Sequence, residues 1–205
     1  MKKNILDFFD DFYDDNEKQY LTSCRIEIRV IEKGRAYPKF FNKISYMSEY
    51  SFNCSESGGD VYWNPHFKHK DKGNISAISY ITCFMTDIDF GTVGHKKLSP
   101  YSSCEEALTA VRKFSLKPTF TIKSGGGLHC YWCFKDPIAI NCEGGESIER
   151  LTAISKNISA ALRSECSDLP HILRVPYTYN YKTKERRLVE IVESNPDKRY
   201  ALSDF

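Results

Sequence analysis

The sequence predicts an α+β (mixed α/β) fold, in which helices cover a sheet that contains antiparallel hairpins. Three observations support this prediction. The chain has 205 residues, 41% of them hydrophobic, which is enough for one sizeable core. Strand-like and helix-like patterns are interleaved along the chain, and a glycine turn at 124–127 joins two strand patterns as a hairpin does.

The first third of the chain combines a helix with two strands. Residues 4–15 predict a short amphipathic helix, and residues 24–32 alternate apolar and charged side chains as a half-buried strand does. A polar loop at 53–60 is expected before a short strand at 61–63, and a basic loop at 66–73 after it. His66 and His69 would then be solvated.

The remaining chain begins with its most apolar strand pattern, at 78–89. Ser103 and Glu106 form a capping-box pattern that opens a helix, and residues 146–164 repeat apolar positions at helical spacing. Two strands, 119–123 and 128–134, flank the glycine turn. Further strand patterns follow at 172–175 and 186–193.

Charge and cysteine usage narrow the class of protein. The net charge of +2 does not indicate a nucleic-acid binder, but residues 174–187 carry five cations against one acid. The eight cysteines form no compact framework, and neither a signal peptide nor a long apolar run is present. We therefore expect free thiols, a reducing cytoplasm and no membrane association. Cys130 and Cys133 would face opposite sides of a strand, which makes a poor zinc clamp.

Asp87 and Asp89 end the most apolar strand pattern, two residues apart and therefore on one face. Two carboxylates this close repel unless a proton or a cation lies between them. Magnesium accepts one or two carboxylates and fills its remaining positions with water and phosphate oxygens. The pair alone also fits a strand that runs into a turn, with one Asp capping and the other solvated.

The stretch KSGGGLH, residues 123–129, could hold an anion. Three glycines free the backbone to present consecutive N–H groups, and the His129 imidazole could donate to a phosphate oxygen. A hairpin turn without a ligand explains the same residues.

The segment 167–182 supplies cations. Arg174 and Lys182 are plausible phosphate contacts, since arginine offers a bidentate fork. The tyrosines at 177, 179 and 181 alternate with polar residues, as in an ordinary edge strand.

In this order and spacing, the Asp-x-Asp strand end, the Ser-Gly-Gly-Gly-x-His turn and a later Asp six residues before Arg-x-Pro resemble the archaeo-eukaryotic primase (AEP) superfamily. The likeness is to the primase–polymerase branch found in plasmid, phage and mobile-element replication proteins, including CRISPR-associated relatives. It covers most of the chain, from about residue 26 to the end. It implies a single catalytic domain over 1–205, excised from a longer protein, with an α/β N-terminal lobe (about 1–75) packed against an RRM-like catalytic lobe (about 76–205).

The resemblance also implies roles for individual residues. Asp87, Asp89 and Asp168 would be the catalytic acids and metal ligands. The residues expected to contact the incoming nucleotide are Ser124, Gly126, His129, Arg174, Asn180 and Lys182. Tyr177 departs from the family pattern, because glycine is usual there, and this puts the conformation of the loop in question. His171 stands where arginine is frequent.

The resemblance implies a DNA-dependent primase–polymerase that synthesises and extends primers on a single-stranded DNA template. The reaction would be two-metal nucleotidyl transfer with Mg²⁺ or Mn²⁺ and NTP or dNTP substrates. One ion would activate a 3′-hydroxyl, and the other would neutralise the departing pyrophosphate. We expect template contacts from basic residues, mostly to phosphates, namely Lys68, Lys70, Lys184 and Arg186. A fused or associated helicase, or another replication or CRISPR component, is an expected partner.

Three alternatives remain at this point. The chain could extend primers in gap filling or translesion synthesis without making them. It could be a non-catalytic single-stranded nucleic-acid binding module that stacks bases on its tyrosines, although such a module needs no acidic cluster. A metal-dependent nuclease would use the carboxylates but would have no role for a triphosphate site.

Overall fold

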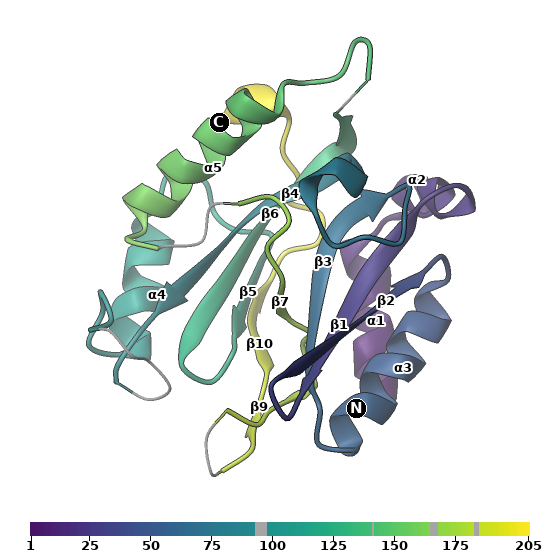
Figure 1. Ribbon diagram of the computed structural model, residues 1–205. Coiled ribbons are helices and arrows are strands. Elements are labelled where there is room, and N and C mark those ends of the chain that lie inside the picture. Colours follow the sequence, from purple (N-terminus) through teal and green to yellow (C-terminus); the bar gives the residue numbers. More distant parts are fainter. Residues whose placement is uncertain (93–97, 141, 165–167, 183–184) are drawn as a thin grey trace.

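The computed structural model describes residues 1–92, 98–140, 142–164, 168–182 and 185–205. It confirms the α+β fold: helices pack on both faces of a large sheet (Figure 1). The helices are α1 (Lys2–Phe12), α2 (Asp15–Lys18), α3 (Ile44–Glu56), α4 (Cys104–Lys113) and α5 (Ile148–Ala161), with 3-10 turns at Gln19–Thr22, Ile75–Ala77 and Leu202–Asp204. The strands are β1 (Arg25–Glu32), β2 (Arg35–Phe41), β3 (Asp60–Lys68), β4 (Ile78–Asp89), β5 (Phe120–Lys123), β6 (Gly127–Ala139), β7 (Leu173–Arg174), β8 (Tyr179–Asn180), β9 (Arg187–Leu188) and β10 (Glu190–Ser194).

Within the described residues, eight strands form one sheet in the order β10-β5-β6-β4-β3-β1-β2, with β7 paired to β3. Strands β8 and β9 form a separate two-stranded hairpin. Neighbouring strands of the large sheet pair antiparallel, including β3 with β4. The sheet therefore runs without a break across the expected boundary near residue 75.

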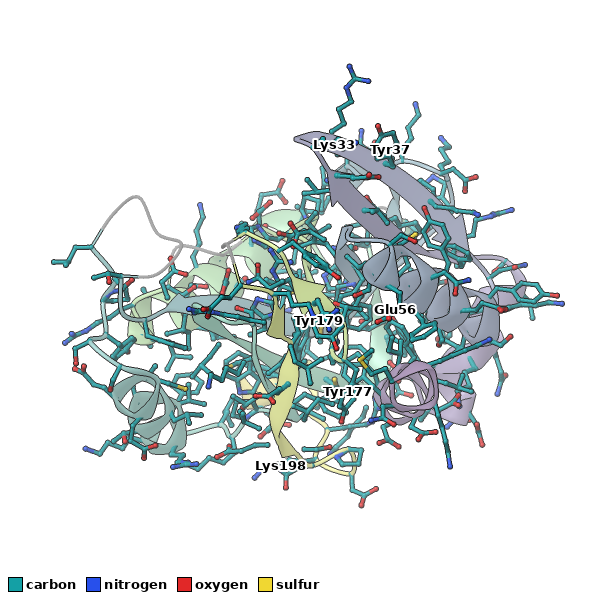
Figure 2. The ribbon with its side chains drawn as sticks, turned by 90° about the horizontal axis from the view of Figure 1, so that it is seen from below. Lys33, Tyr37, Glu56, Tyr177, Tyr179 and Lys198 are labelled. Atoms are coloured by element: carbon teal, nitrogen blue, oxygen red, sulfur yellow. The ribbon has the colours of Figure 1, made fainter. Side chains whose placement is uncertain are left out.

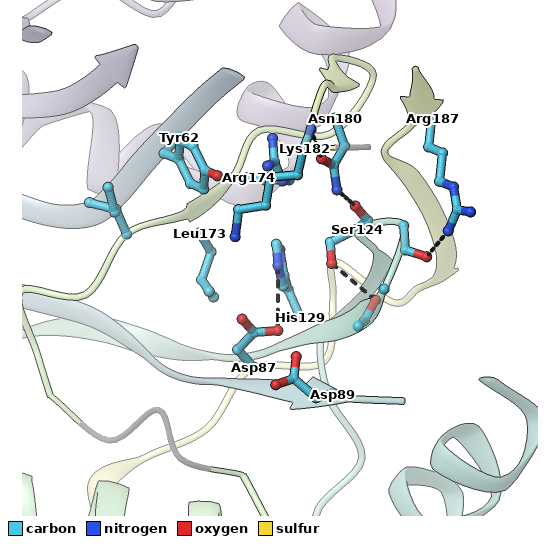
Figure 3. A pocket seen from close by; sticks show the side chains of 14 residues that line it. Tyr62, Asp87, Asp89, Ser124, His129, Leu173, Arg174, Asn180, Lys182 and Arg187 are labelled. Carbon is cyan, nitrogen blue, oxygen red and sulfur yellow. Dashed lines mark hydrogen bonds and ion pairs between the residues drawn. The ribbon is translucent and has the colours of Figure 1, made fainter. Parts of the chain in front are cut away.

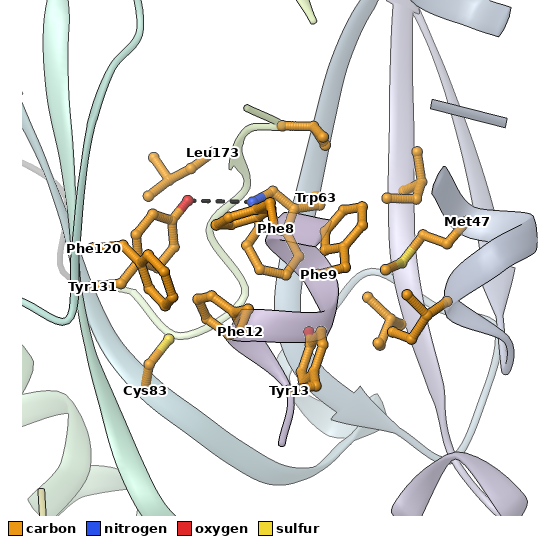
Figure 4. Close-up of a cluster of buried hydrophobic side chains, with 14 of the residues drawn as sticks. Phe8, Phe9, Phe12, Tyr13, Met47, Trp63, Cys83, Phe120, Tyr131 and Leu173 are labelled. Atoms are coloured by element: carbon orange, nitrogen blue, oxygen red, sulfur yellow. Dashed lines mark hydrogen bonds between the residues drawn. The ribbon is translucent and has the colours of Figure 1, made fainter. Parts of the chain in front are cut away.

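Helix α1 fills the core on one face of the sheet (Figure 4). Its buried positions, Ile5, Phe8, Phe9 and Phe12, follow the 3.6-residue period of an amphipathic helix. Phe12 meets the indole of Trp63 edge-on with ring centroids 4.7 Å apart, and Trp63 Nε1 donates to the Tyr131 hydroxyl at 3.2 Å. Through these contacts the N-terminal helix supports the strands that carry the candidate site.

The opposite face is covered by α4 and α5 (Figure 1). Side chains alternate along β6, so Tyr131 and Cys133 join the α1 cluster whereas Cys130 and Trp132 join the second cluster. This confirms that the two cysteines face opposite sides. The cysteines among the described residues are free thiols.

Two loop predictions are wrong. Helix α3 extends to Glu56, into the expected polar loop, and β3 continues to Lys68, into the expected basic loop. The buried side of α3 includes Ser48, Ser51 and Ser55, so its helical period is not visible as an apolar pattern. His66 is fully buried rather than solvated, and burial lowers its pKa to about 3.

Lys68 is also fully buried, with its Nζ 3.4 Å from Glu27 Oε2. Burial lowers the pKa of Lys68, while Glu27 opposes that shift. The prediction that Lys68 contacts the template is therefore wrong: its ammonium is enclosed beside a buried carboxylate. Lys70 is exposed and remains a candidate.

Arg199, near the end of the described chain, binds the C-terminal end of α1 and the α2 helix that follows it. Arg199 donates from Nη2 to the Phe12 carbonyl and from Nη1 to Glu17 Oε2, both at 2.7 Å. Burial raises the pKa of Glu17 to about 7, although Arg199 opposes the shift. Among the described residues, no helix combines the length and apolar character needed to cross a membrane.

Candidate active site

A cleft of about 200 Å³ opens where β4 ends and β6 begins (Figure 3). It is lined by residues from five regions: strand β3, the end of β4, the turn between β5 and β6 with the start of β6, strand β7, and the β8–β9 hairpin. The predicted site residues that line it are Asp87, Asp89, Ser124, Gly126, His129, Arg174, Asn180 and Lys182. Arg187, which was not predicted, also lines it. The structure thus gathers residues that lie far apart in the sequence.

Asp87 and Asp89 project into this cleft from one face of β4, where Asp87 is paired with His129 and Asp89 with Gly127 of β6. A Cβ atom on Gly127 would lie 3.0 Å from Asp87 Oδ1 and 3.4 Å from Asp89 Oδ1. The two carboxylates therefore converge over a glycine that leaves them room. An oxygen pair beside an open cleft fits Mg²⁺ or Mn²⁺, which complete their shells with water and phosphate oxygens.

His129 lies beside this pair, 3% exposed, with Nε2 3.6 Å from Asp87 Oδ1. Burial lowers the pKa of His129 to about 3, and the nearby Arg174, His171 and Lys182 contribute to the shift. The imidazole is therefore neutral near pH 7, with one N–H donor. Its Nδ1 is buried and has no hydrogen-bond partner among the described residues.

Hydrogen bonds between its first and last residues close the glycine turn, residues 124–127. Gly127 O accepts from the Ser124 backbone N–H at 2.9 Å and from Ser124 Oγ at 3.2 Å. Gly125 has φ +110°, and a Cβ there would lie 2.9 Å from Asn180 Nδ2. Both the backbone angle and the close neighbour require glycine at this position.

Three other segments hold the turn from outside. Asn180 Nδ2 donates to Ser124 O at 2.7 Å, Arg187 Nη1 to Gly125 O at 3.2 Å, and the Phe90 N–H to Gly126 O at 3.0 Å. The turn is therefore ordered by the protein itself and does not depend on a ligand for its shape.

Arg174 lies across the cleft from the carboxylates (Figure 3). Its Nη1 donates to Asp60 Oδ1 at 2.5 Å, and its Cζ lies 4.6 Å from the centre of the Tyr62 ring. The side chain is 3% exposed, and Nη2 has no hydrogen-bond partner among the described residues. Nη1 of the guanidinium is thus fixed by Asp60, while Nη2 could donate a hydrogen bond to an anion.

Asp60 and Tyr62 are site residues that sequence reasoning missed. Asp60 Oδ1 accepts from Arg174 and also from the Tyr181 N–H, at 2.8 Å, so it links β7 to the β8 segment. Burial raises the pKa of Tyr62 to about 12, which keeps its hydroxyl protonated. No sequence signal could have identified Asp60, because its partner Arg174 lies 114 residues away.

Asn180 and Lys182 face the cleft, and the Lys182 N–H donates to Asn180 Oδ1 at 3.0 Å. The neighbouring tyrosines bind α3 instead. The Tyr181 hydroxyl donates to Ser55 O at 2.7 Å, and the Tyr179 N–H donates to Ser55 Oγ at 2.9 Å. The Tyr181 side chain and the Tyr179 backbone therefore anchor the hairpin to α3, while the Tyr179 ring packs against Tyr181 and Arg186.

Tyr177, which stands where the family usually has glycine, adopts φ +60°. Its N–H donates to Val189 O at 2.8 Å, and its ring packs against the α1 cluster. The backbone conformation that suits glycine is therefore kept despite the substitution, and Asn180 and Lys182 still reach the cleft.

Asp168 is not among the residues that line the cleft. Its side chain is 63% exposed, and its Oδ1 lies 3.0 Å from His171 Nδ1. Within the described part of the chain, no three His, Cys, Asp or Glu side chains are close enough to hold a metal together. The role of Asp168 as a third ligand stays a prediction.

Two of the template candidates lie on the surface. Arg186 is exposed, with its Cζ 4.4 Å from the centre of the Tyr179 ring, and Lys70 is exposed in the segment after β3. Lys184 lies outside the described residues. The contacts of these three residues with DNA stay predictions.

No family model and no curated protein matches the chain. Solved structures do share its fold. The AEP domain of the cyanophage S-2L primase–polymerase is 12% identical, with a TM-score of 0.63 over 91% of this chain and 90% of that one. The catalytic domain of primase RepB', in complex with initiator DNA, is 14% identical, with a TM-score of 0.57 over 87% of this chain and 85% of that one. A further primase RepB' structure gives a TM-score of 0.56 at 14% identity, over 87% of this chain and 57% of that one.

Proposed function

Because the chain has the fold of primase and primase–polymerase catalytic domains, we propose that it is a DNA-dependent nucleotidyltransferase that makes and extends primers on single-stranded template. One observation carries the proposal: a paired carboxylate site and a site for anions share one cleft. Asp87 and Asp89 lie on one side, Arg174 and Lys182 lie across the cleft from them, and the glycine turn borders the carboxylates through Gly127. A nucleoside triphosphate with its divalent cations needs both.

Asp87 and Asp89 would hold Mg²⁺ or Mn²⁺, and Asp168 is the predicted third ligand. Such ions lower the pKa of a 3′-hydroxyl and neutralise charge on the transferred phosphates. Asp87 and Asp89 supply oxygen ligands from a single strand, and the glycine beneath them leaves that position open.

The remaining residues would bind and orient the triphosphate. Arg174 offers its buried Nη2, while Asp60 and Tyr62 keep the guanidinium from rotating. Lys182 adds a second cation. His129 is neutral, so it would donate a hydrogen bond to a phosphate oxygen without adding charge. Fixed donors of this kind need little reorganisation when charge develops in the transition state.

The structure disfavours two of the three alternative functions and leaves one as a second candidate. A binding module that stacks bases on the tyrosines at 177, 179 and 181 is disfavoured, because the Tyr177 ring packs against the α1 cluster and the Tyr181 hydroxyl binds Ser55 O. A nuclease gives no role to Arg174 and the glycine turn together. A polymerase that only extends primers uses the same cleft, so it remains the second candidate. Cytoplasmic location and a helicase or CRISPR partner stay predictions.

The test is nucleotide incorporation on an unprimed single-stranded template with labelled NTPs or dNTPs and Mg²⁺ or Mn²⁺. We expect Asp87→Asn and Asp89→Asn each to reduce incorporation at least about 10²-fold, because removal of a ligand costs several kcal/mol of transition-state stabilisation. Asp136→Asn, which changes an exposed carboxylate on β6, is the matched control and should keep full activity.

Incorporation that survives in both Asp variants would overturn the assignment of the site. Products on a primed but not on an unprimed template would show that the chain is a polymerase that only extends primers. Degradation of the template that needs the same two carboxylates would favour the nuclease.

Arg174→Lys tests the anion side of the cleft separately. Lysine keeps the charge but lacks the planar fork that lets Nη1 bind Asp60 while Nη2 points to a separate position in the cleft. We expect KM for the nucleotide to rise about tenfold, in line with the ~1.5–3 kcal/mol of a hydrogen bond to a charged group. Lys156→Arg, at an exposed position of α5, controls for the exchange of cation type; an unchanged KM in Arg174→Lys would remove Arg174 from the binding site.

A further inference from the structure

A second surface combines cations with aromatic rings, away from the cleft lining. Strand β2 lies at the edge of the sheet, and its residues from Arg35 to Lys39 are exposed. Because strand side chains alternate, every second residue points to the same side. That side of β2 reads Arg35, Tyr37, Lys39, Phe41. We call this row, together with Lys43 just before α3 and Tyr46 and Tyr50 on α3, the β2–α3 face.

Cations and rings are in contact on the β2–α3 face. Lys39 Nζ lies 4.5 Å from the centre of the Tyr50 ring and 5.5 Å from that of Phe41. Lys43 Nζ lies 5.2 Å from the centre of the Tyr46 ring. These contacts hold the ammonium groups beside the aromatic surfaces.

Two of the rings remain open to solvent: Tyr37 is 48% exposed and Tyr46 is 58% exposed. Figure 2 shows Tyr37 projecting from the body of the molecule near Lys33. A groove of about 490 Å³ runs between β2 and α3, lined by Lys39, Phe41, Tyr46 and Tyr50 among others. Exposed rings gathered beside a groove are typical of a binding surface.

The charge of the β2–α3 face is of one sign. Residues 33–48 include four cations, Lys33, Arg35, Lys39 and Lys43, and no Asp or Glu. Glu49 also lines the groove, but its carboxylate is 2.9 Å from Lys2 Nζ. The face therefore suits an anionic ligand that also presents flat apolar rings.

We propose that the β2–α3 face binds single-stranded nucleic acid outside the active-site cleft, with bases stacked on Tyr37 and Tyr46 and phosphates against Lys39 and Lys43. Bases stack on aromatic rings whatever their sequence, and cations alongside follow the backbone. The choice of nucleic acid as the ligand rests on the proposed function, since a template-dependent enzyme meets single strands. Among the described residues, the groove and the cleft share no lining residue, so the two sites can be separated by mutation.

The test measures the affinity of the full chain for a labelled oligothymidylate by fluorescence anisotropy at several salt concentrations. We expect Tyr37→Ala/Tyr46→Ala to weaken binding at least about fivefold. Lys39→Ala/Lys43→Ala should make log K depend less steeply on log salt, by about 0.7 for each phosphate that is no longer neutralised. Lys135→Ala/Lys156→Ala removes the same charge from exposed positions elsewhere and should change neither quantity.

Unchanged affinity and salt dependence in both β2–α3 variants would overturn the inference, as would an equally large effect in the control pair. Binding of polyglutamate, but not of oligothymidylate, through the same residues would replace it with an acidic protein ligand. The experiment needs no catalysis. Weakened binding in a chain that incorporates no nucleotide would contradict the proposed function alone, and incorporation with unchanged binding would contradict this inference alone.

Discussion

Tyr177 shows how a single residue can keep a conformation that suits a different amino acid. Its φ of +60° lies in the left-handed region, which costs a residue with a Cβ roughly 1–2 kcal/mol. The N–H bond to Val189 O and the packing of the ring against the α1 cluster hold it there. The ring therefore offsets a backbone penalty that glycine would avoid.

This balance gives a differential prediction. Tyr177→Ala loses the ring and keeps the backbone penalty, whereas Tyr177→Gly loses the ring and relieves the penalty. We expect the glycine variant to be more stable than the alanine variant by about 1 kcal/mol in the free energy of urea unfolding.

The control is the same pair of substitutions at Glu190, an exposed position in β10 that is paired with Lys123 of β5. Glycine should there be the less stable of the two, because extended backbone favours a residue with a Cβ. If alanine were the more stable replacement at both positions, the backbone at 177 would not be strained.

At the scale of elements, the β8–β9 hairpin and the glycine turn act as one unit. Asn180 joins them, since its Nδ2 donates to Ser124 O and its Oδ1 accepts from the Lys182 N–H. A short hairpin of two-residue strands has little stability of its own. Its position over the cleft therefore depends on bonds of this kind.

Asn180→Ala should consequently misplace Lys182 and loosen the turn. We expect the free energy of unfolding to fall by about 1–3 kcal/mol and KM for the nucleotide to rise about tenfold, since a buried amide and its two hydrogen bonds are removed. Stability by urea unfolding and KM by nucleotide titration check the two parts. Asn157→Ala, at an exposed position of α5, should change neither. An unaltered KM in Asn180→Ala would mean that the turn holds its shape without the hairpin.

At the scale of the whole molecule, much of the fold follows from local patterns. The helices α1, α4 and α5 and the strands β1, β4, β5 and β6 have clear periodicity, and the pairing of β5 with β6 follows from the glycine turn. Helix α3 and the end of β3 do not follow, because serines and a buried His66 and Lys68 occupy positions where apolar residues are expected. Burial of polar groups depends on partners that the local sequence does not contain.

Some residues of the candidate site can be predicted from the sequence, and others cannot. Asp87, His129 and Arg174 stand next to recognisable turns or strand ends, so motif spacing identifies them. Asp60 and Tyr62 act through Arg174, and only the pairing of β3 with β7 brings them there. Positioning residues of this type are set by topology, which is why sequence reasoning missed them.

Two buried histidines predict how stability depends on pH. The pKa values of His66 and His129 are about 3 in the folded chain and about 6.5 when unfolded. Between these values the unfolded chain binds more protons, so stability is full above pH 6.5 and falls as pH decreases. Each histidine contributes a slope approaching about 1.4 kcal/mol per pH unit. Glu17, with its pKa raised to about 7, acts in the opposite direction between pH 4.5 and 7.

We therefore expect the free energy of unfolding to decrease as the pH falls from 6.5 to 5. In His66→Asn this decrease should be less steep, by the contribution of one histidine, about 1.4 kcal/mol per pH unit. Urea unfolding at several pH values measures this. His69→Asn, at an exposed histidine bonded to Ser79, is the control. A slope that stays the same in His66→Asn would show that His66 is not buried in its neutral form; if that variant does not fold, His129→Asn gives the same comparison.

The bonds from Arg199 to Phe12 and Glu17 also have a consequence for synthesis on the ribosome. Helix α1 precedes its partners along the chain: Trp63 of β3 follows early, but Phe120 and Tyr131 are translated much later. Arg199, which holds the end of the helix, comes later still. Until these residues have been made, part of the apolar surface of α1 stays uncovered, which exposes the nascent chain to aggregation. We expect the nascent chain to depend on chaperones until the segment with Arg199 has emerged, and to fold afterwards at a rate limited by these distant contacts.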